Sequence, residues 1–183
     1  MRADSLLLVL AASVLLACGP AVTPVCQGAS CACTAGQCGC TSGTCTQTCT
    51  GGGCASTCTN ATCTLSSGDS ASISCSTSST CTGTIGASAS VTCSNSAKCD
   101  LNTGASATVV CNNSADCDVK VGAGSNVTCN NSAECGVECS GACTVVCTET
   151  SKCRCEGAGC SLTCATGGPT TCPDGRLVCN RDC

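Results

Sequence analysis

A chain of 183 residues with 29 Cys and no Phe, Trp, Tyr or His has the composition of a disulfide scaffold rather than of a domain with an aromatic core. Its formal net charge is -4, with 10% charged residues and no basic run, which argues against a surface that follows phosphate backbones, so we expect no nucleic-acid partner. Val, Ile, Leu, Ala and cystine must form the interior, and covalent bonds must supply much of its stability.

The first segment, residues 1–17, is predicted to be an export signal. Arg2 precedes an uncharged run from Ser5 to Ala17. This run is about half the length that crosses a bilayer, so it indicates a secretion signal rather than a membrane span.

The end of this signal, Leu15-Leu16-Ala17-Cys18, resembles the lipobox of bacterial lipoproteins. In that family the signal is cut before the cysteine, whose sulfur carries a diacylglyceryl group. The resemblance implies lipidation of Cys18, a lipidated tether over residues 18–25, and a membrane anchor on the bacterial cell envelope, at the outer membrane or cell surface. The alternative is a plain signal with Cys18 in a disulfide. Without Cys18 an even number of 28 Cys remains, which can pair completely and so favours lipidation.

Residues 26–57 are predicted to form a cysteine-rich N-terminal cap or short coils. Their cysteines come in pairs separated by four residues, and we expect each pair to close a short disulfide loop. The same spacing continues into the next segment, where Cys58 and Cys63 follow Cys40 and Cys45 at the interval of the repeat that begins at Cys75. The candidate pairs are Cys26–Cys31, Cys33–Cys38, Cys40–Cys45, Cys49–Cys54 and Cys58–Cys63.

Residues 58–164 are predicted to be β-solenoid repeats, because from Cys75 onward a pair of cysteines six apart returns at a constant interval. Small or apolar residues alternate with polar ones before each pair, as in Ala107, Val109 and Cys111, and again after it, as in Cys117, Val119 and Val121. Each alternation indicates a strand with one buried face. The central candidate pairs are Cys75–Cys81, Cys93–Cys99, Cys111–Cys117, Cys129–Cys135 and Cys147–Cys153.

Two short strands cannot bury a face alone, but identical units that stack can. The predicted fold class is therefore all-β: a disulfide-rich, single-stranded β-helix (β-solenoid) with about 18 residues per coil, whose handedness the sequence does not determine. The coil length resembles that of triangular β-helices. Both cysteines of a pair should point inward and meet across a corner. We also expect an asparagine ladder at that corner and a column of glycines at a turn that needs unusual backbone angles or close packing. The asparagines are Asn95, Asn113 and Asn131, and the glycines are Gly68, Gly86, Gly104 and Gly122.

Residues 165–183 are predicted to form a C-terminal cap, because Pro169, Pro173 and Arg176 interrupt the repeat. Pairing each remaining cysteine with its nearest partner in sequence leaves none unused. This gives the candidates Cys139–Cys143, Cys155–Cys160, Cys164–Cys172 and Cys179–Cys183.

The sequence offers no nucleophile and base for catalysis, because it has no His and the pairing spares no Cys. We expect no catalytic residue, no enzyme activity, no cofactor and no metal. Asp100, Asp116 and Asp118 could form a carboxylate patch for a cation, but a solvated strand face is favoured. A second column of opposite charges should form pairs between coils, each worth well under about 1 kcal/mol; it contains Lys98, Asp116, Glu134 and Lys152.

Two binding functions are alternatives. A thiolate metal store is indicated by Cys31-Ala32-Cys33, Cys38-Gly39-Cys40 and Cys153-Arg154-Cys155, but exported cysteines oxidise. Ice binding is indicated by Thr-Cys-Thr triplets, such as those at residues 44–46, 48–50, 57–59 and 62–64, and by Thr92-Cys93-Ser94-Asn95-Ser96-Ala97-Lys98-Cys99, which resembles the Thr-Cys-x-x-Ser-x-x-Cys unit of insect antifreeze β-helices. The triplets are irregularly spaced, and the positions beside the first cysteine of each pair hold no threonine array.

The favoured interpretation is a non-enzymatic, envelope-anchored lipoprotein with a structural, adhesive or binding role. The leader and composition resemble the small cysteine-rich lipoproteins of environmental bacteria, a type that implies no activity. The sequence identifies the membrane as a partner through the lipid anchor, but no protein or carbohydrate partner.

Overall fold

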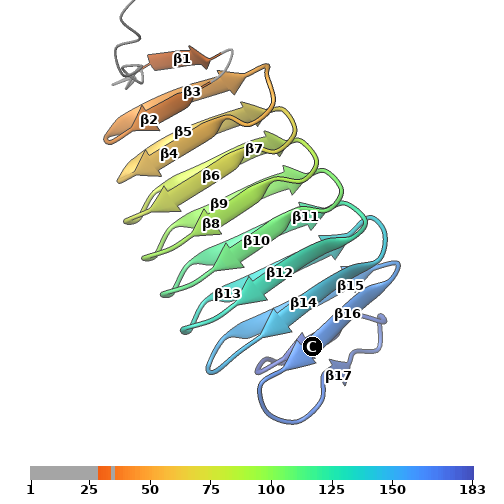
Figure 1. Cartoon of the computed structure of the whole chain (residues 1–183). Coiled ribbons are helices and arrows are strands. Elements are labelled where there is room, and N and C mark those ends of the chain that lie inside the picture. Colours follow the sequence, from red (N-terminus) through yellow and green to blue (C-terminus); the bar gives the residue numbers. More distant parts are fainter. Residues whose placement is uncertain (1–28, 34–35) are drawn as a thin grey trace, which may run out of the picture.

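The computed structural model describes residues 29–33 and 36–183, and the regular structure in this part of the chain is entirely β-strand. The strands form two sheets, and each coil of the chain contributes one strand to each sheet (Figure 1). Sheet A has the order β1 (Ala29–Cys33), β3 (Gly43–Cys49), β5 (Ala61–Ser67), β7 (Thr80–Ile85), β9 (Lys98–Thr103), β11 (Asp116–Val121), β13 (Glu134–Cys139), β15 (Lys152–Gly157), β18 (Leu177–Cys179) and β17 (Thr170–Thr171). Sheet B has the order β16 (Cys160–Cys164), β14 (Cys143–Cys147), β12 (Ser125–Cys129), β10 (Thr108–Cys111), β8 (Ser90–Cys93), β6 (Ser72–Ser76), β4 (Ala55–Thr59) and β2 (Gln37–Cys40).

The register confirms the β-solenoid and the coil length that the spacing of the cysteines predicts. Val109 of β10 lies opposite Val91 and Val127 in the neighbouring parallel strands, and Val119 of β11 lies opposite Leu101 and Val137. Identical columns therefore stack from coil to coil, as the sequence repeat requires. One residue is missing where β4 meets β6, since Cys58 lies opposite Cys75.

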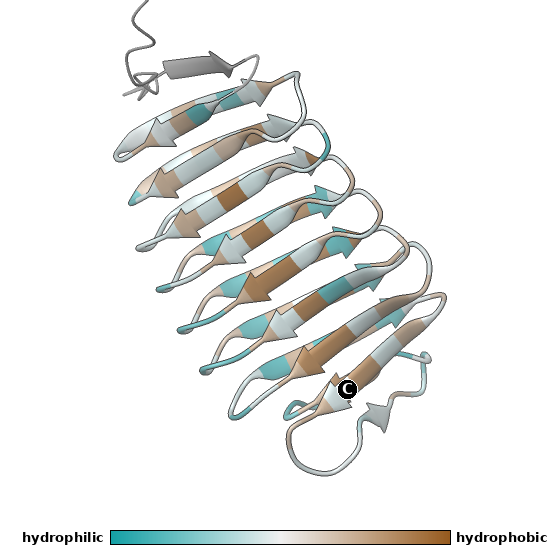
Figure 2. Ribbon diagram, viewed as in Figure 1, coloured by the Kyte–Doolittle hydropathy of each residue, from teal (hydrophilic) through white to brown (hydrophobic). Residues whose placement is uncertain are grey.

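The described coils are flattened between two sheets, so the similarity in length to triangular β-helices does not extend to a third sheet. The alternating residues of each strand point inward and meet those of the other sheet. Figure 2 shows the hydrophobic residues as brown bands along the middle of the strands. Sheet B contributes a buried column that includes Ile73, Val91, Val109, Val127 and Val145, and sheet A contributes one that includes Leu65, Leu101, Val119 and Val137.

Each coil turns at two corners. At the cystine corner, the chain passes from sheet B to sheet A through residues such as Asn95 and Ser96, which have φ of 54° and 61°. The predicted asparagine ladder is present there: the Asn113 amide donates to Asn95 Oδ1 over 3.2 Å, and the Asn131 amide donates to Asn113 Oδ1 over 3.3 Å. These bonds join one coil to the next.

At the glycine corner, the chain returns from sheet A to sheet B. Of the two reasons that the sequence offered for the glycine column, close packing is the one that applies. A Cβ atom on Gly122 would lie 2.5 Å from the backbone nitrogen of Ala105 in the preceding coil. The left-handed backbone conformation of this turn lies two residues later, at Ser106 with φ of 58° and at Gly124 with φ of 76°.

The C-terminal segment reverses direction. β18 pairs with β15 in antiparallel register, and β17 pairs with β18 in the same way. These two strands cover the edge of sheet A that β15 would otherwise expose, which blunts the end of the stack against further strand addition. Sheet B ends at β16.

Candidate functional site

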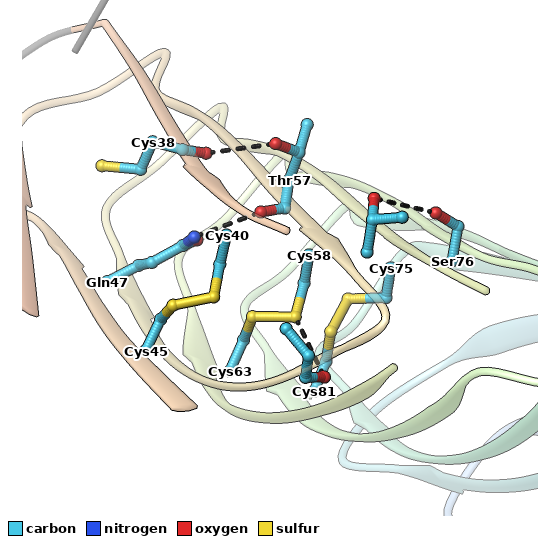
Figure 3. Close-up of a disulfide and its surroundings, with 12 residues drawn as sticks. Cys38, Cys40, Cys45, Gln47, Thr57, Cys58, Cys63, Cys75, Ser76 and Cys81 are labelled. Carbon is cyan, nitrogen blue, oxygen red and sulfur yellow. Dashed lines mark hydrogen bonds between the residues drawn. A yellow bond between two sulfur atoms is a disulfide. The ribbon is translucent and has the colours of Figure 1, made fainter. Parts of the chain in front are cut away.

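The main feature of the interior over residues 36–183 is a ladder of eight disulfides along the cystine corner, which we call rungs. Each rung joins a strand of sheet B to a strand of sheet A, and Figure 3 shows three successive rungs near the N-terminal end. The Cα–Cα distances are 5.7–6.5 Å, within the range of native disulfides. The rungs are Cys40–Cys45, Cys58–Cys63, Cys75–Cys81, Cys93–Cys99, Cys111–Cys117, Cys129–Cys135, Cys147–Cys153 and Cys164–Cys179.

The first seven rungs join the cysteines that the spacing pairs. The cysteines of successive rungs lie opposite one another in both sheets, as Cys93, Cys111 and Cys129 do in sheet B. A cysteine pair six apart therefore recurs because each coil carries one disulfide across the same corner. The predicted lipidation residue Cys18, the tether and Cys26 lie outside the described residues. The structure describes only the backbone of Cys31 and Cys33, so the candidate pairs Cys26–Cys31 and Cys33–Cys38 stay predictions.

Two predicted pairs near the C-terminus, Cys164–Cys172 and Cys179–Cys183, are wrong. The structure pairs Cys164 with Cys179, and Cys172 with Cys183. Cys164 lies opposite Cys147 in sheet B, and the antiparallel β18 brings Cys179 opposite Cys153 in sheet A. The C-terminal strand thus supplies the second half of the last rung, which pairing by nearest sequence neighbour could not reveal.

Three further disulfides lie at the glycine corner, at the two ends of the described rod. They are Cys49–Cys54, Cys139–Cys143 and Cys155–Cys160, and they agree with the predicted pairs. Every cysteine from Cys38 to Cys183 is disulfide-bonded. This range of the chain therefore offers no thiolate for nucleophilic attack in its oxidised state.

The outward face of sheet A carries a regular threonine grid on β3, β5 and β7. The sequence analysis considered the positions beside the first cysteine of each pair, which lie in sheet B, whereas this array lies beside the second cysteines Cys45, Cys63 and Cys81. Thr46 lies opposite Thr64, which lies opposite Thr82, and parallel columns flank this one on both sides. We define the threonine grid as Thr44, Thr46, Thr48, Thr62, Thr64, Ser66, Thr80, Thr82 and Thr84; each is exposed or half-buried.

The same face of sheet A is charged on β9, β11, β13 and β15. The predicted column of Lys98, Asp116, Glu134 and Lys152 is in register, but no ion pair in the described chain joins two of its members. Lys120 pairs with Glu138 at 2.5 Å in the neighbouring column, and Glu134 pairs with Arg181 at 3.2 Å. Exposed pairs of this kind contribute well under about 1 kcal/mol each.

One carboxylate of the predicted patch, Asp118, is engaged by a guanidinium. Asp100 and Asp118 are neighbours across β9 and β11, but Arg154 reaches over β13 to place a nitrogen 3.2 Å from Asp118 Oδ1. Gly136 makes this contact possible, because a Cβ atom there would lie 2.2 Å from the same oxygen. A hollow on this surface is lined by both signs of charge, including Lys120, Arg154 and Glu138, which gives no concentrated site for a cation.

Beyond this face, the Arg176 backbone N–H donates to Asp174 over 3.1 Å and, together with the Arg176 side chain, lowers the pKa of the Asp174 carboxyl. This exposed pair belongs to the C-terminal turn.

The opposite surface, the outward face of sheet B, carries no charged residue on β4 to β16. Its two central columns contain Ser, Thr, Val and Asn, for example Thr108 and Val110 on β10.

Comparison with known proteins gives no match: no family model, no curated protein and no solved structure corresponds to this chain. Within the described residues, no helix has the length and hydrophobicity that crossing a membrane requires.

Proposed function

We propose that the protein is an exported, lipid-anchored rod with a structural or adhesive role on a bacterial cell envelope, and that it is not an enzyme. The observation that supports this proposal is the ladder of rungs, which places one covalent link in each coil of the described solenoid. Such extensive disulfide bonding is consistent with an oxidising compartment outside the cytoplasm.

The rungs give the rod a stability that does not depend on a thick core. A disulfide that closes a loop this short contributes about 2 kcal/mol by restricting the unfolded chain. Because each rung acts within its own coil, the contributions are local and repeat along the axis. A rod held in this way stays folded at a surface where proteases and changing solutes would unfold a marginal domain.

The proposed anchor is the lipid on Cys18. The segment before it has the features of an export signal, and the cysteines after it are even in number. Two or more acyl chains on one residue hold a protein stably on a bilayer. Residues 18–25 then connect the anchor to the first coil.

The test of the anchor is Cys18→Ser, with Thr23→Ser in the tether as the matched control. We expect Cys18→Ser to take up no labelled fatty acid and to remain uncleaved or be released, whereas Thr23→Ser stays in the membrane fraction. Fractionation and mass spectrometry of the N-terminal peptide measure both. A Cys18→Ser protein that is correctly processed and still membrane-bound contradicts the proposal.

Ice binding is a second candidate function, and the threonine grid is the observation that favours it. Strand geometry spaces its side chains about 6.7 Å along a strand and about 4.8 Å between strands. The grid is uncharged and lies on parallel strands in register, and each threonine presents a methyl and a hydroxyl group. A surface of this kind can order water in a fixed lattice, which is what adsorption to an ice crystal requires.

Thr64→Lys tests this function, because Thr64 lies at the centre of the grid with neighbours on all four sides. Asn102→Lys, on the charged part of the same sheet face, is the control. We expect the oxidised protein to lower the freezing point of its solution below the melting point of ice in that solution. Thr64→Lys should abolish this gap, and Asn102→Lys should retain it. No gap in the unmodified protein, or an equal gap in both variants, would refute ice binding.

A further inference from the structure

The glycine corner near the C-terminal end holds a cluster of four sulfur atoms. They belong to two disulfides in consecutive coils, Cys139–Cys143 and Cys155–Cys160. All four Sγ atoms lie within 4.8 Å of one another, and Cys139 Sγ and Cys155 Sγ, which are not bonded, are 3.9 Å apart.

These two disulfides are not needed to close their coils. The same coils are already linked at the cystine corner by Cys129–Cys135 and Cys147–Cys153. The coils before them turn at the glycine corner without any cysteine, through residues such as Gly104 and Ala105. The four cysteines are therefore additional to the repeat.

The sulfur atoms converge because the second pair is shifted in register. In sheet B, Cys143 lies opposite Cys160. In sheet A, however, Cys139 lies opposite Gly157, and Cys155 comes two residues earlier. Gly157 has φ of 99°, and a Cβ atom on it would lie 2.2 Å from the Cys139 carbonyl oxygen, so no side chain stands between the two disulfides at this position.

We propose that Cys139, Cys143, Cys155 and Cys160 form a tetrathiolate site for one zinc ion once a dithiol has reduced both disulfides. Each dithiol is oxidised to a cyclic disulfide as it converts one protein disulfide into two thiols, and the zinc ion then replaces the four thiol protons. Tetrahedral coordination with Zn–S bonds of about 2.3 Å places sulfur atoms about 3.8 Å apart. The separation of Cys139 Sγ and Cys155 Sγ is already close to this value.

The backbone around the site stays in place when the two disulfides open. β13 and β15 remain paired over six residues, and β14 and β16 over five. The rungs Cys129–Cys135, Cys147–Cys153 and Cys164–Cys179 continue to join the two sheets beside the site. Zinc would therefore bind ligands that are held close together, which reduces the entropy lost on binding.

Access and composition distinguish this cluster from the rungs. Cys160 is half-buried, and Ala158 and Gly159 beside it are exposed, so a small reductant and an ion can reach the corner. Elsewhere in the described chain, groups of neighbouring sulfur atoms contain three cysteines that are all buried, such as Cys75, Cys81 and Cys99. A group of three leaves zinc without a fourth protein sulfur.

The experiment uses the full oxidised chain, a graded amount of dithiothreitol, and Co²⁺ as the spectroscopic probe. Thiols opened at each step are alkylated and located by mass spectrometry. We expect Cys139, Cys143, Cys155 and Cys160 to open first, one Co²⁺ per chain to bind with the absorption of tetrahedral thiolate coordination, and one Zn²⁺ to displace it. The oxidised chain should bind none.

Cys139→Ser/Cys143→Ser removes one of the two disulfides, and we expect it to weaken Co²⁺ binding by more than about 100-fold, since two of four ligands are lost. Cys111→Ser/Cys117→Ser is the matched control and should retain the site. The proposal is overturned if the rungs open before these two disulfides, if the partly reduced chain binds no Co²⁺, or if both variants bind Co²⁺ equally. The outcome does not depend on the lipid anchor or on ice binding.

Discussion

Single residues at the glycine corner determine how closely successive coils approach. Gly104 and Gly122 have ordinary negative φ values, but a Cβ atom on either would lie within 2.6 Å of backbone atoms in the preceding coil. The neighbouring atoms belong to the backbone and cannot rotate away. A side chain at these positions must therefore push two coils apart, against the hydrogen bonds that hold the sheets together.

We expect Gly122→Ala to destabilise the protein by about 1–3 kcal/mol for this reason. Gly168→Ala is the control, because a Cβ atom on Gly168 has no atom within 4 Å. The thermal midpoint of unfolding, measured with all disulfides intact, should fall for Gly122→Ala and stay within error for Gly168→Ala. Equal midpoints would show that the coils are not in close contact at Gly122.

The sequence predicted the glycine column, and it also predicted the asparagine ladder. It left open whether the glycines serve backbone angle or packing, because residue identity alone does not show how near the adjacent coil lies. The role of Gly136 was not recognised for the same reason. Its value depends on Arg154, which lies opposite it in the next coil and reaches across it to Asp118.

The repeating structural unit of this protein is one coil with its rung. Cys111 is the last residue of β10, and Cys117 is the second residue of β11. The disulfide between them therefore fixes the corner between the two sheets. The parallel ladders then attach the coil to its neighbours. Stability in such an array is approximately a sum of terms for each coil and each interface.

We expect Cys111→Ser/Cys117→Ser to cost about 2 kcal/mol and to leave the neighbouring rungs intact. Either single substitution should be more harmful, because it leaves a thiol that can attack adjacent disulfides. Denaturant unfolding gives the cost, and counting free thiols after unfolding gives the state of the other rungs. Free thiols in the double variant would contradict the assignment of this rung to one coil.

The period of the cysteines was sufficient to predict the strands, the coil and the rungs from Cys40 to Cys153, and pairing of nearest neighbours predicted the disulfides at the glycine corner. The period did not predict the threonine grid. The sequence prediction considered the first cysteine of each pair, which lies in sheet B, whereas the threonines flank the second cysteine, which lies in sheet A. It also failed after Cys160. There the chain leaves the repeat, and an antiparallel return such as β18 has no periodic signal.

The whole rod presents surfaces of different chemistry along one axis. On sheet A, the threonine grid of β3, β5 and β7 gives way to the charged strands β9 to β15, while the outward face of sheet B is uncharged on β4 to β16. β18 and β17 close one edge of sheet A. One disulfide-linked framework therefore presents a threonine surface, a charged surface and an uncharged surface.

The central claim, one disulfide per coil across the same corner, is tested most directly by mapping disulfides with an endoproteinase that cleaves before aspartate, under denaturing, non-reducing conditions. The digest places Cys111 alone in peptide 100–115 and Cys117 alone in peptide 116–117. The structure predicts that these two peptides are joined only to each other, that peptide 69–99 is joined to nothing, and that peptides 174–181 and 182–183 are both attached to peptide 118–173. A link from peptide 100–115 to peptide 69–99 or to peptide 118–173 would place the disulfides between coils and contradict the account.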